Sequence, residues 1–493
     1  MPQTRYNHGC GQECEVVYVK LIRSFSMLAT IKQFLKKITQ SLWGKFESRA
    51  EVRKFLSLAV TFFFMIFVYW IMHPVKDSIF AATVGVTNTP WAKIFSAIFL
   101  LPVVMIYTKL IDTFKRDKVF YIMMIAYAVL AIAFAAFFMY SEYGLADKVV
   151  SSSRIMGWLW YFYVESFGSV IVALFWVIVT DITLPESAKR GFPLIYLFGQ
   201  IGNLVGPYFI TAKNLGFKTS APIIGICGLL MFLIGFLLWL FMRFTPKDQL
   251  VSYEGQAKQA LRQAQDERAK TEEKVGFLEG IKIIMQHGYL MGILFVIMTY
   301  EIIVTIFDYQ FKVMAKAAFP LEAANAAYLA KYGYTTGIVA TLCVLFGINS
   351  IQRKLGMFTS LLMTPILVAV AIFVFKTYPV LGVAFWIMVF AKAINYALNQ
   401  PTLKNLYVPV TKVTRYKSMS WIEMFGGRSS KSLGSAVNLL RKVFTSKYGL
   451  AGVHMFIMVS SYISFGLVIA WLFVAFYLAK KHKKAIAHNE VVC

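Results

Sequence analysis

The sequence predicts an all-α polytopic membrane protein with about 12 transmembrane helices, and three observations support this fold class. First, 58% of the 493 residues are hydrophobic and 15% are charged, whereas about a quarter of a typical soluble domain is charged. Second, apolar runs of about 18 residues or more recur along the chain, and each can cross a bilayer as a helix. Third, loops rich in Lys and Arg alternate with loops that are poor in them.

Each predicted span is a mostly apolar run that ends at a polar or basic turn. The turns are short, except for one long polar stretch after the sixth run. In chain order, the runs cover 54–84, 91–110, 119–140, 155–182, 192–211, 221–243, 288–311, 333–350, 358–376, 379–398, 420–440 and 453–479.

The long polar stretch divides the spans six and six. It is charged and lacks an apolar face, which is typical of a cytoplasmic linker. Two six-span halves joined in this way match the major-facilitator plan, in which the substrate site lies near the midplane between the halves. The predicted organisation is an N-terminal tail (1–53), a first half (54–243), the linker (244–287), a second half (288–479) and a C-terminal tail (480–493).

The formal net charge of +26 indicates topology rather than nucleic-acid binding. Most cations lie in both ends of the chain and in the even-numbered loops, whereas residues 81–90 contain none. The positive-inside rule therefore places both termini in the cytoplasm. We expect the lipid bilayer and an anionic substrate as partners and no nucleic acid, and a monomer is the usual state of this architecture.

No pattern in the chain indicates an enzyme or a cofactor, and His8, Cys10 and Cys14, which faintly resemble a metal cluster, are interpreted as part of an unstructured tail. The sequence has no HExxH, GxSxG, kinase or Walker motif. Gly427-x-x-x-Lys431-Ser432 resembles a phosphate-binding loop, but Ser430 stands where a glycine must precede the lysine. The five cysteines suggest no disulfide framework.

The first span contains His73-Pro74-Val75-Lys76-Asp77-Ser78. A cation at bilayer depth costs roughly 2.5–3.5 kcal/mol on insertion scales, so it is rarely kept without a use. His73 and Asp77 are four residues apart and share a helix face, whereas Lys76 points about 100° away from Asp77 and is a candidate to line a cavity. In the alternative, the span ends near Met72 and Lys76 lies at the membrane interface.

The fourth and seventh spans carry candidate carboxylates. In the fourth, Glu165 bonds a ribose hydroxyl or base, pairs with a cation or carries a coupling proton, or else makes a structural hydrogen bond to a neighbouring helix. Asp181 at the end of this span is a candidate gate or loop residue. In the seventh, Glu301 and Asp308 are seven apart and share a face. Lys312 follows Asp308 by four residues and either neutralises it or snorkels to the membrane surface.

The eleventh span carries Arg428 and Lys431, three residues apart on one helix face, with Gly427 and Gly434 on the same side. A guanidinium beside an ammonium suits a phosphate chain. The alternative is a structural salt bridge from Glu423 to one of these cations. Two further cations at membrane depth, Lys93 and Lys392, belong to no motif and are interpreted as snorkelling side chains.

At these positions the chain resembles the nucleotide transporters of plastids and obligate intracellular bacteria, the ATP/ADP translocases unrelated to mitochondrial carriers. The matching segments occur in order over nearly the whole chain: Lys76-Asp77-Ser78; Glu165 with Gly168-Ser169 and Phe175-Trp176; Asp308-x-x-Phe311-Lys312; and Pro401-Thr402, Tyr407-Val408-Pro409, Lys417 and Ile422-Glu423 to Lys431-Ser432. The chain departs from the family's pattern around the cations, with His73 for an arginine, Gln400 for an acid and Asp308 for a glutamate.

The resemblance implies a secondary transporter that exchanges ATP- and ADP-type nucleotides by alternating access, in the inner membrane of an intracellular bacterium. Lys76, Arg428 and Lys431 are then expected to hold the phosphates, and Glu165 and Asp308 to face the sugar or base or to help close the gates. The candidates for coupling or gating are His73, Asp77, Asp181, Glu301, Lys312, Lys417 and Glu423. The alternatives are proton-coupled symport of a nucleotide or NAD, and transport of another organic anion.

Overall fold

The computed structural model describes residues 46–183, 185–246, 250, 277–345, 348–407, 409–410, 414, 418, 421–422 and 426–488. Every regular element in these ranges is a helix. Lys417, Glu423, most of the predicted N-terminal tail and most of the predicted linker lie outside the described residues. The exact domain boundaries therefore stay a prediction.

The first half of the chain forms six long helices. They are α2 (Arg49–Phe80), α3 (Thr89–Thr113), α4 (Arg116–Tyr140), α5 (Ile155–Asp181), α6 (Pro185–Phe209) and α7 (Ala221–Phe244). The Ser48 side chain accepts a hydrogen bond of 3.0 Å from the backbone N–H of Glu51 and caps α2. At its other end α2 passes through a π-turn and a 3₁₀ turn into α3, where Gly85 adopts φ 100°, a conformation that glycine adopts without a steric cost.

The second half forms six further long passages. They are built from α10 (Gly288–Ala318), α11 (Glu322–Leu345), α12 (Ile348–Thr377), α13 (Leu381–Ile394) continued through a π-turn (Asn395–Asn399) into α14 (Gln400–Leu406), and the two arms of α16 (Gly427–His488). Gly449, with φ 57°, separates the arms of α16. A short helix, α9 (Phe277–Gln286), precedes α10.

Eight helical stretches of the described chain are long and apolar enough to cross a membrane. Two of them, Arg49–Val103 and Gly427–His488, contain the turns at Gly85 and Gly449, so each comprises two crossings. Adding α6 and α11, which are 25 and 24 residues long, gives the twelve passages that the hydrophobic pattern predicts. The predicted fold class is confirmed.

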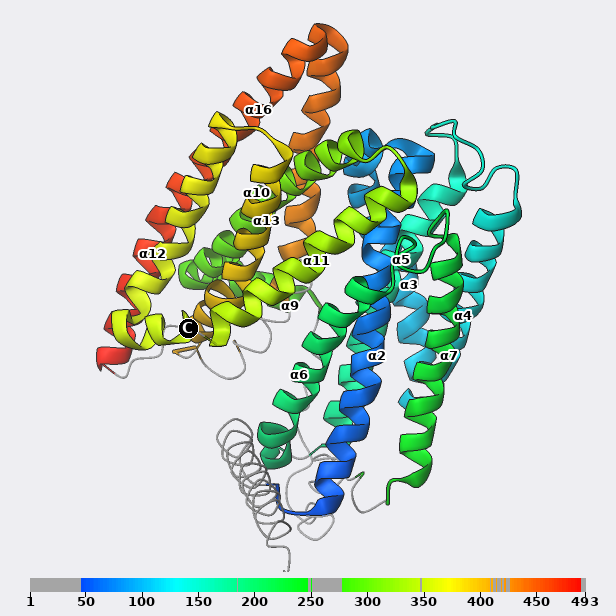
Figure 1. Ribbon diagram of the computed structural model, residues 1–493. Helices are drawn as coiled ribbons and strands as arrows, with labels where there is room; N and C mark the ends of the chain where they lie inside the picture. The colour runs from blue at the N-terminus through cyan, green and yellow to red at the C-terminus, as the bar shows by residue number, and fades with distance from the viewer. Residues whose placement is uncertain are drawn as a thin grey trace, which may run out of the picture.

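Each half has its own hydrophobic core. One cluster of buried residues extends from Phe55 to Phe241 and the other from Ile284 to Ala479. Helix α11 packs against α2 and α6, and α16 packs against α3, so these pairs join the halves. Figure 1 shows that the two bundles converge on the face that carries the hairpin turn of α16, here called the loop face. They diverge toward the face where α2 begins and α16 ends, here called the terminal face.

Candidate functional site

A polar cavity of about 360 Å³ lies between the two halves, within the range of roughly 300–1,000 Å³ that small-molecule sites occupy. Helices α2, α3 and α5 of the first half and α10, α13 and α16 of the second line it. Its charged lining residues are Lys76, Lys93, Glu165, Glu301, Asp308, Lys312, Lys392, Arg428 and Lys431. The cavity therefore collects nearly all of the membrane-depth charges that the sequence singles out.

Lys76 of α2 is paired with carboxylates of its own half. Its Nζ atom forms an ion pair with Glu165 of α5 and lies 3.7 Å from Oδ1 of Asp77. The same ammonium lies 4.5 Å from the centre of the Tyr161 ring. Only 1% of Lys76 is exposed and α2 continues to Phe80, so the alternative in which the helix ends near Met72 does not hold.

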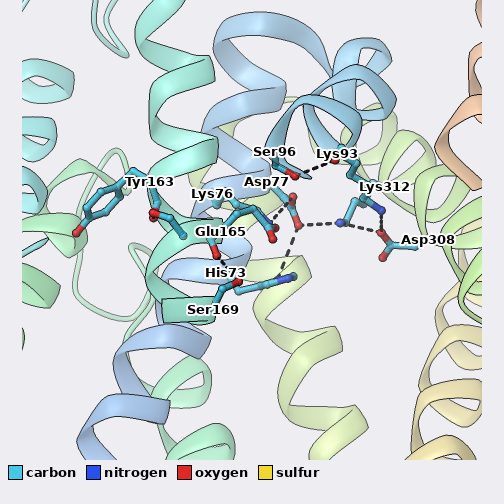
Figure 2. Close-up of polar contacts among 11 residues, drawn as sticks. His73, Lys76, Asp77, Lys93, Ser96, Tyr163, Glu165, Ser169, Asp308 and Lys312 are labelled. Atoms are coloured by element: carbon cyan, nitrogen blue, oxygen red, sulfur yellow. Dashed lines mark hydrogen bonds and ion pairs between the residues drawn. The ribbon is translucent and has the colours of Figure 1, made fainter. Parts of the chain in front are cut away.

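Two ion pairs link the halves at the cavity's end nearer the loop face, and a third, within α10, connects them (Figure 2). Lys312 of α10 lies 2.9 Å from Asp77 of α2 and 2.9 Å from Asp308 one helical turn earlier. Lys93 of α3 lies 2.9 Å from the same Oδ2 atom of Asp308. The predicted neutralisation of Asp308 by Lys312 is present, and each of these residues also contacts the opposite half.

Three cations of the second half have no carboxylate partner among the described residues. Arg428 and Lys431 project from the first arm of α16 into the cavity, and the predicted helix spacing places them on the same wall. Lys392 of α13 also lines the cavity, and its ammonium lies 5.3 Å from the centre of the Tyr332 ring. Whether Glu423 pairs with Arg428 or Lys431 lies outside the described residues.

The charge of the cavity is uneven between the halves. If Asp77, which lines a small adjoining pocket, is counted with the cavity, the first half contributes two lysines and two carboxylates. The second half contributes four cations and two carboxylates. Among the described residues, the formal excess of two positive charges therefore comes from the second half, where it is available to an anion.

The remaining predicted residues separate into two groups. His73 lines the cavity with its Nδ1 atom 3.9 Å from Asp77, and Glu301 lines it without an ion pair among the described residues. Asp181, in contrast, ends α5 and pairs with Arg116 at the start of α4. That pair lies within the first half and away from the cavity, so the structure does not bring Asp181 to the site.

The interpretation of Lys93 and Lys392 as snorkelling side chains is wrong, because both line the cavity. The signal that singles out Lys76, a cation in an apolar run, is equally present at both positions. Polar and aromatic residues on the cavity wall were also missed, and their pattern does not distinguish them from ordinary helix contacts: Tyr69, Tyr300, Asn395 and Tyr396.

With this geometry in view, comparison with known proteins identifies the family. Residues 28–383 match the family model described as the TLC ATP/ADP transporter. The chain belongs to this family. The match covers the first half and the second half as far as residue 383, and it includes Lys76, Lys93, Glu165, Asp308 and Lys312, which form the ion pairs around the cavity.

Named relatives span nearly the full chain. ADP,ATP carrier protein 1 of Rickettsia prowazekii is 25% identical over 93% of this chain and 99% of its own length. The chloroplastic ADP,ATP carrier protein 2 of Arabidopsis thaliana is 24% identical over 89% of this chain and 76% of its own length. Members of this family therefore occur in both bacteria and plastids, as the resemblance implies.

Solved transporter structures share the fold. The nucleoside transporter NupG (D323A mutant) aligns with a TM-score of 0.60 at 12% identity, over 85% of this chain and 99% of that one. A bacterial homologue of the lysosomal transporter Spinster, in an inward-facing conformation, aligns with a TM-score of 0.57 at 15% identity, over 89% and 99%. At these identities the likeness shows the fold alone, and that fold is major-facilitator-like.

Proposed function

We propose that this multi-pass membrane protein is a nucleotide transporter that exchanges ATP- and ADP-type nucleotides by alternating access. The observation that carries the proposal is the cavity between the halves, in which Arg428, Lys431 and Lys392 have no carboxylate partner among the described residues. A polyphosphate supplies the negative charge that these cations lack. The family and the names of the relatives favour a nucleotide over other polyanions.

The three cations differ in what they offer a phosphate chain. The Arg428 guanidinium presents a planar fork of N–H donors, which suits two oxygens of one phosphate or of adjacent phosphates. The ammonium groups of Lys431 and Lys392 act as point charges that tolerate several phosphate positions. Lys76 joins this set only when it releases Glu165, which then faces the sugar or base.

Exchange follows from the charge of the empty cavity. Moving an excess of positive charge through a low-dielectric barrier is costly, so the empty protein reorients slowly. A bound nucleoside diphosphate or triphosphate neutralises the excess and lowers that cost. Each inward movement is therefore expected to require an outward movement of another nucleotide.

The terminal face is proposed to be cytoplasmic. Described basic residues that lie at this face include Arg53, Arg243 and Lys484, in agreement with the positive-inside rule. The polar contacts that join the halves in the described residues lie toward the loop face, so the cavity is reached from the cytoplasmic side. We propose a monomer in the inner membrane of an intracellular bacterium.

Proteoliposomes test this function directly. Labelled ATP uptake should be fast when the vesicles contain ADP and at least about tenfold slower when they are empty. An uncoupler should not change the rate. Equal uptake into loaded and empty vesicles would contradict exchange, and no nucleotide uptake under any condition would contradict the nucleotide assignment.

Proton symport remains a second candidate because of Glu301. This carboxylate lines the cavity without an ion pair among the described residues, so a coupling role for it would break no ion pair seen there. If symport operates, uptake into empty vesicles should follow an imposed inward proton gradient and should lose that dependence in Glu301→Gln. Uptake that ignores the gradient would exclude this role.

A further inference from the structure

Where ion pairs link the halves, two lysines contact the same oxygen atom of Asp308. Oδ2 of Asp308 lies 2.9 Å from Lys93 of the first half and 2.9 Å from Lys312 of the second. All three side chains line the cavity and are largely buried, with 15%, 10% and 9% exposed for Lys93, Asp308 and Lys312. Two ammonium groups from opposite halves therefore converge on one carboxylate oxygen.

The neighbouring carboxylate is incompletely satisfied. Oδ2 of Asp77 accepts the contact from Lys312, but Oδ1 is buried and has no hydrogen-bond partner among the described residues, with the Lys76 ammonium 3.7 Å away. A buried acceptor without a partner costs free energy. Lys93, Asp308, Lys312 and Asp77 are here called the bridging cluster. The free energy of this cluster falls if its lysines and carboxylates change partners so that the Asp77 oxygen gains a hydrogen bond.

A phosphate group is better suited than a carboxylate to hold two converging ammonium groups. It has three terminal oxygens, so it can accept from Lys93 and Lys312 through different atoms, and it carries more charge at neutral pH. Once Lys312 binds a phosphate, its contacts with Asp77 and Asp308 weaken. The Lys312–Asp77 contact joins α10 to α2 near the loop face, and the Lys93–Asp308 contact, which joins α3 to α10, weakens when Lys93 turns to the phosphate.

We propose that Lys93 and Lys312 form a second phosphate subsite, which Asp308 occupies in the empty protein. The proposal rests on the nucleotide function proposed above, and it explains how nucleotide binding is coupled to movement of the two halves. A nucleotide held by Arg428 and Lys431 extends its terminal phosphate to the bridging cluster and displaces Asp308. Loading then separates the halves at the loop face, and only a nucleotide with enough phosphates reaches both sites.

Leak and selectivity test the subsite. Vesicles loaded with labelled ADP are diluted into medium with or without ATP, and the ratio of leak to exchange is measured. Asp308→Asn should raise this ratio at least about tenfold, because a tenfold change in rate needs only about 1.4 kcal/mol. Lys93→Gln should raise the ratio too and should reduce the preference for ATP over AMP. Asp147→Asn is the matched control, since its 3.7 Å pair with Arg154 lies near the loop face within the first half.

A labelling experiment tests the subsite with Lys93 and Asp308 intact, in case the variants at these positions do not fold. The backbone N–H of Ser220 donates to Glu322 of the second half over 2.8 Å, and Ser220 is fully buried. In a background whose native cysteines are replaced by serine, Ser220→Cys should react with an impermeant maleimide at least about threefold faster with ATP than with AMP, as the halves separate.

The outcomes separate this proposal from the proposed function. Suppose that the wild-type protein exchanges nucleotides, that the leak and selectivity of the Asp308 and Lys93 variants match those of Asp147→Asn, and that labelling is equal with ATP and AMP. The subsite is then wrong and the function stands. If the wild-type protein exchanges no nucleotide, the function itself fails. Faster labelling with AMP than with ATP would also overturn the subsite.

Discussion

The two halves use their buried charges differently. In the first half, Lys76 is enclosed by Glu165, Asp77 and Tyr161, and its charge is balanced before any substrate arrives. In the second half, Arg428 and Lys431 face the cavity with no carboxylate partner among the described residues. A membrane-depth cation is thus not by itself a binding residue. Its partners decide whether it stabilises the protein or remains available to an anion.

Removing the available cations should have the largest effect on transport. Each charged hydrogen bond to a phosphate is worth roughly 1.5–3 kcal/mol, so Arg428→Ala and Lys431→Ala should each raise the half-saturating ATP concentration by about tenfold or more. The double variant should lose at least about a hundredfold. Saturation curves of ATP uptake in ADP-loaded vesicles give these values.

Lys442→Ala is the control for this prediction, because Lys442 is exposed on the same arm of α16 and does not line the cavity. It should leave uptake unchanged. A half-saturating ATP concentration in the double variant equal to that of the wild-type protein would contradict the claim that the second half provides the phosphate-binding cations.

Breaking the Lys76–Glu165 pair should instead reduce stability. Glu165→Gln leaves the buried Lys76 ammonium with only Asp77, at 3.7 Å. Because Glu165 itself is 39% exposed, the cost should lie between the roughly 0–1 kcal/mol of an exposed pair and the roughly 3–5 kcal/mol of a fully buried one. Thermal unfolding in detergent should show a lower midpoint for Glu165→Gln, and Lys76→Gln in the same chain should restore part of the loss. A double variant less stable than either single variant would contradict the pairing.

A smaller effect is expected where α16 meets α10. A Cβ atom on Gly434 would lie 2.8 Å from the carbonyl oxygen of Ile302, so the helices must separate to accept it. Overpacking of this kind costs about 1–3 kcal/mol, and Gly434→Ala should lower the unfolding midpoint. Gly466→Ala should not lower it, because Gly466 lies on the other arm and no atom of the described part of the chain is within 4 Å of the added carbon.

The smallest effect is expected for the pair between Arg116 and Asp181. Both side chains are partly exposed, at 44% and 38%, and exposed pairs contribute about 0–1 kcal/mol. Asp181→Asn should change neither the unfolding midpoint nor ATP uptake. A clear loss of uptake would restore the gating role that the sequence suggests for Asp181.

The sequence predicted contacts within a helix better than contacts between helices. The period of 3.6 residues correctly brings Lys312 to Asp308 and places Glu301 on the cavity side of α10. It cannot show that Glu165 is the partner of Lys76, 89 residues away, or that Lys93 meets Asp308, 215 residues away. Those contacts depend on which helices are neighbours, and hydropathy does not specify that.

Glycine and span boundaries show the same limit. Gly434 does permit close approach, to α10, whereas an added carbon at Gly427 would meet no atom of the described residues within 4 Å. From the sequence spacing, both glycines are equally good candidates for close helix packing. Only the position of the neighbouring helix shows that Gly434 is packed and Gly427 is not. The length of a membrane-crossing run, in contrast, depends mainly on bilayer thickness, so the number of crossings was predictable, although α6 and α11 are not among the eight described stretches that are apolar enough to cross by composition.

Nucleotide binding as a function of phosphate number tests the central claim most directly. Calorimetric titration of the purified protein with ATP, ADP, AMP and adenosine should show affinity that rises with each phosphate. In the Arg428→Gln, Lys431→Gln double variant, that rise should be nearly lost while adenosine binding stays the same. Equal dependence on phosphate number in the two proteins would contradict a phosphate site formed by the second half.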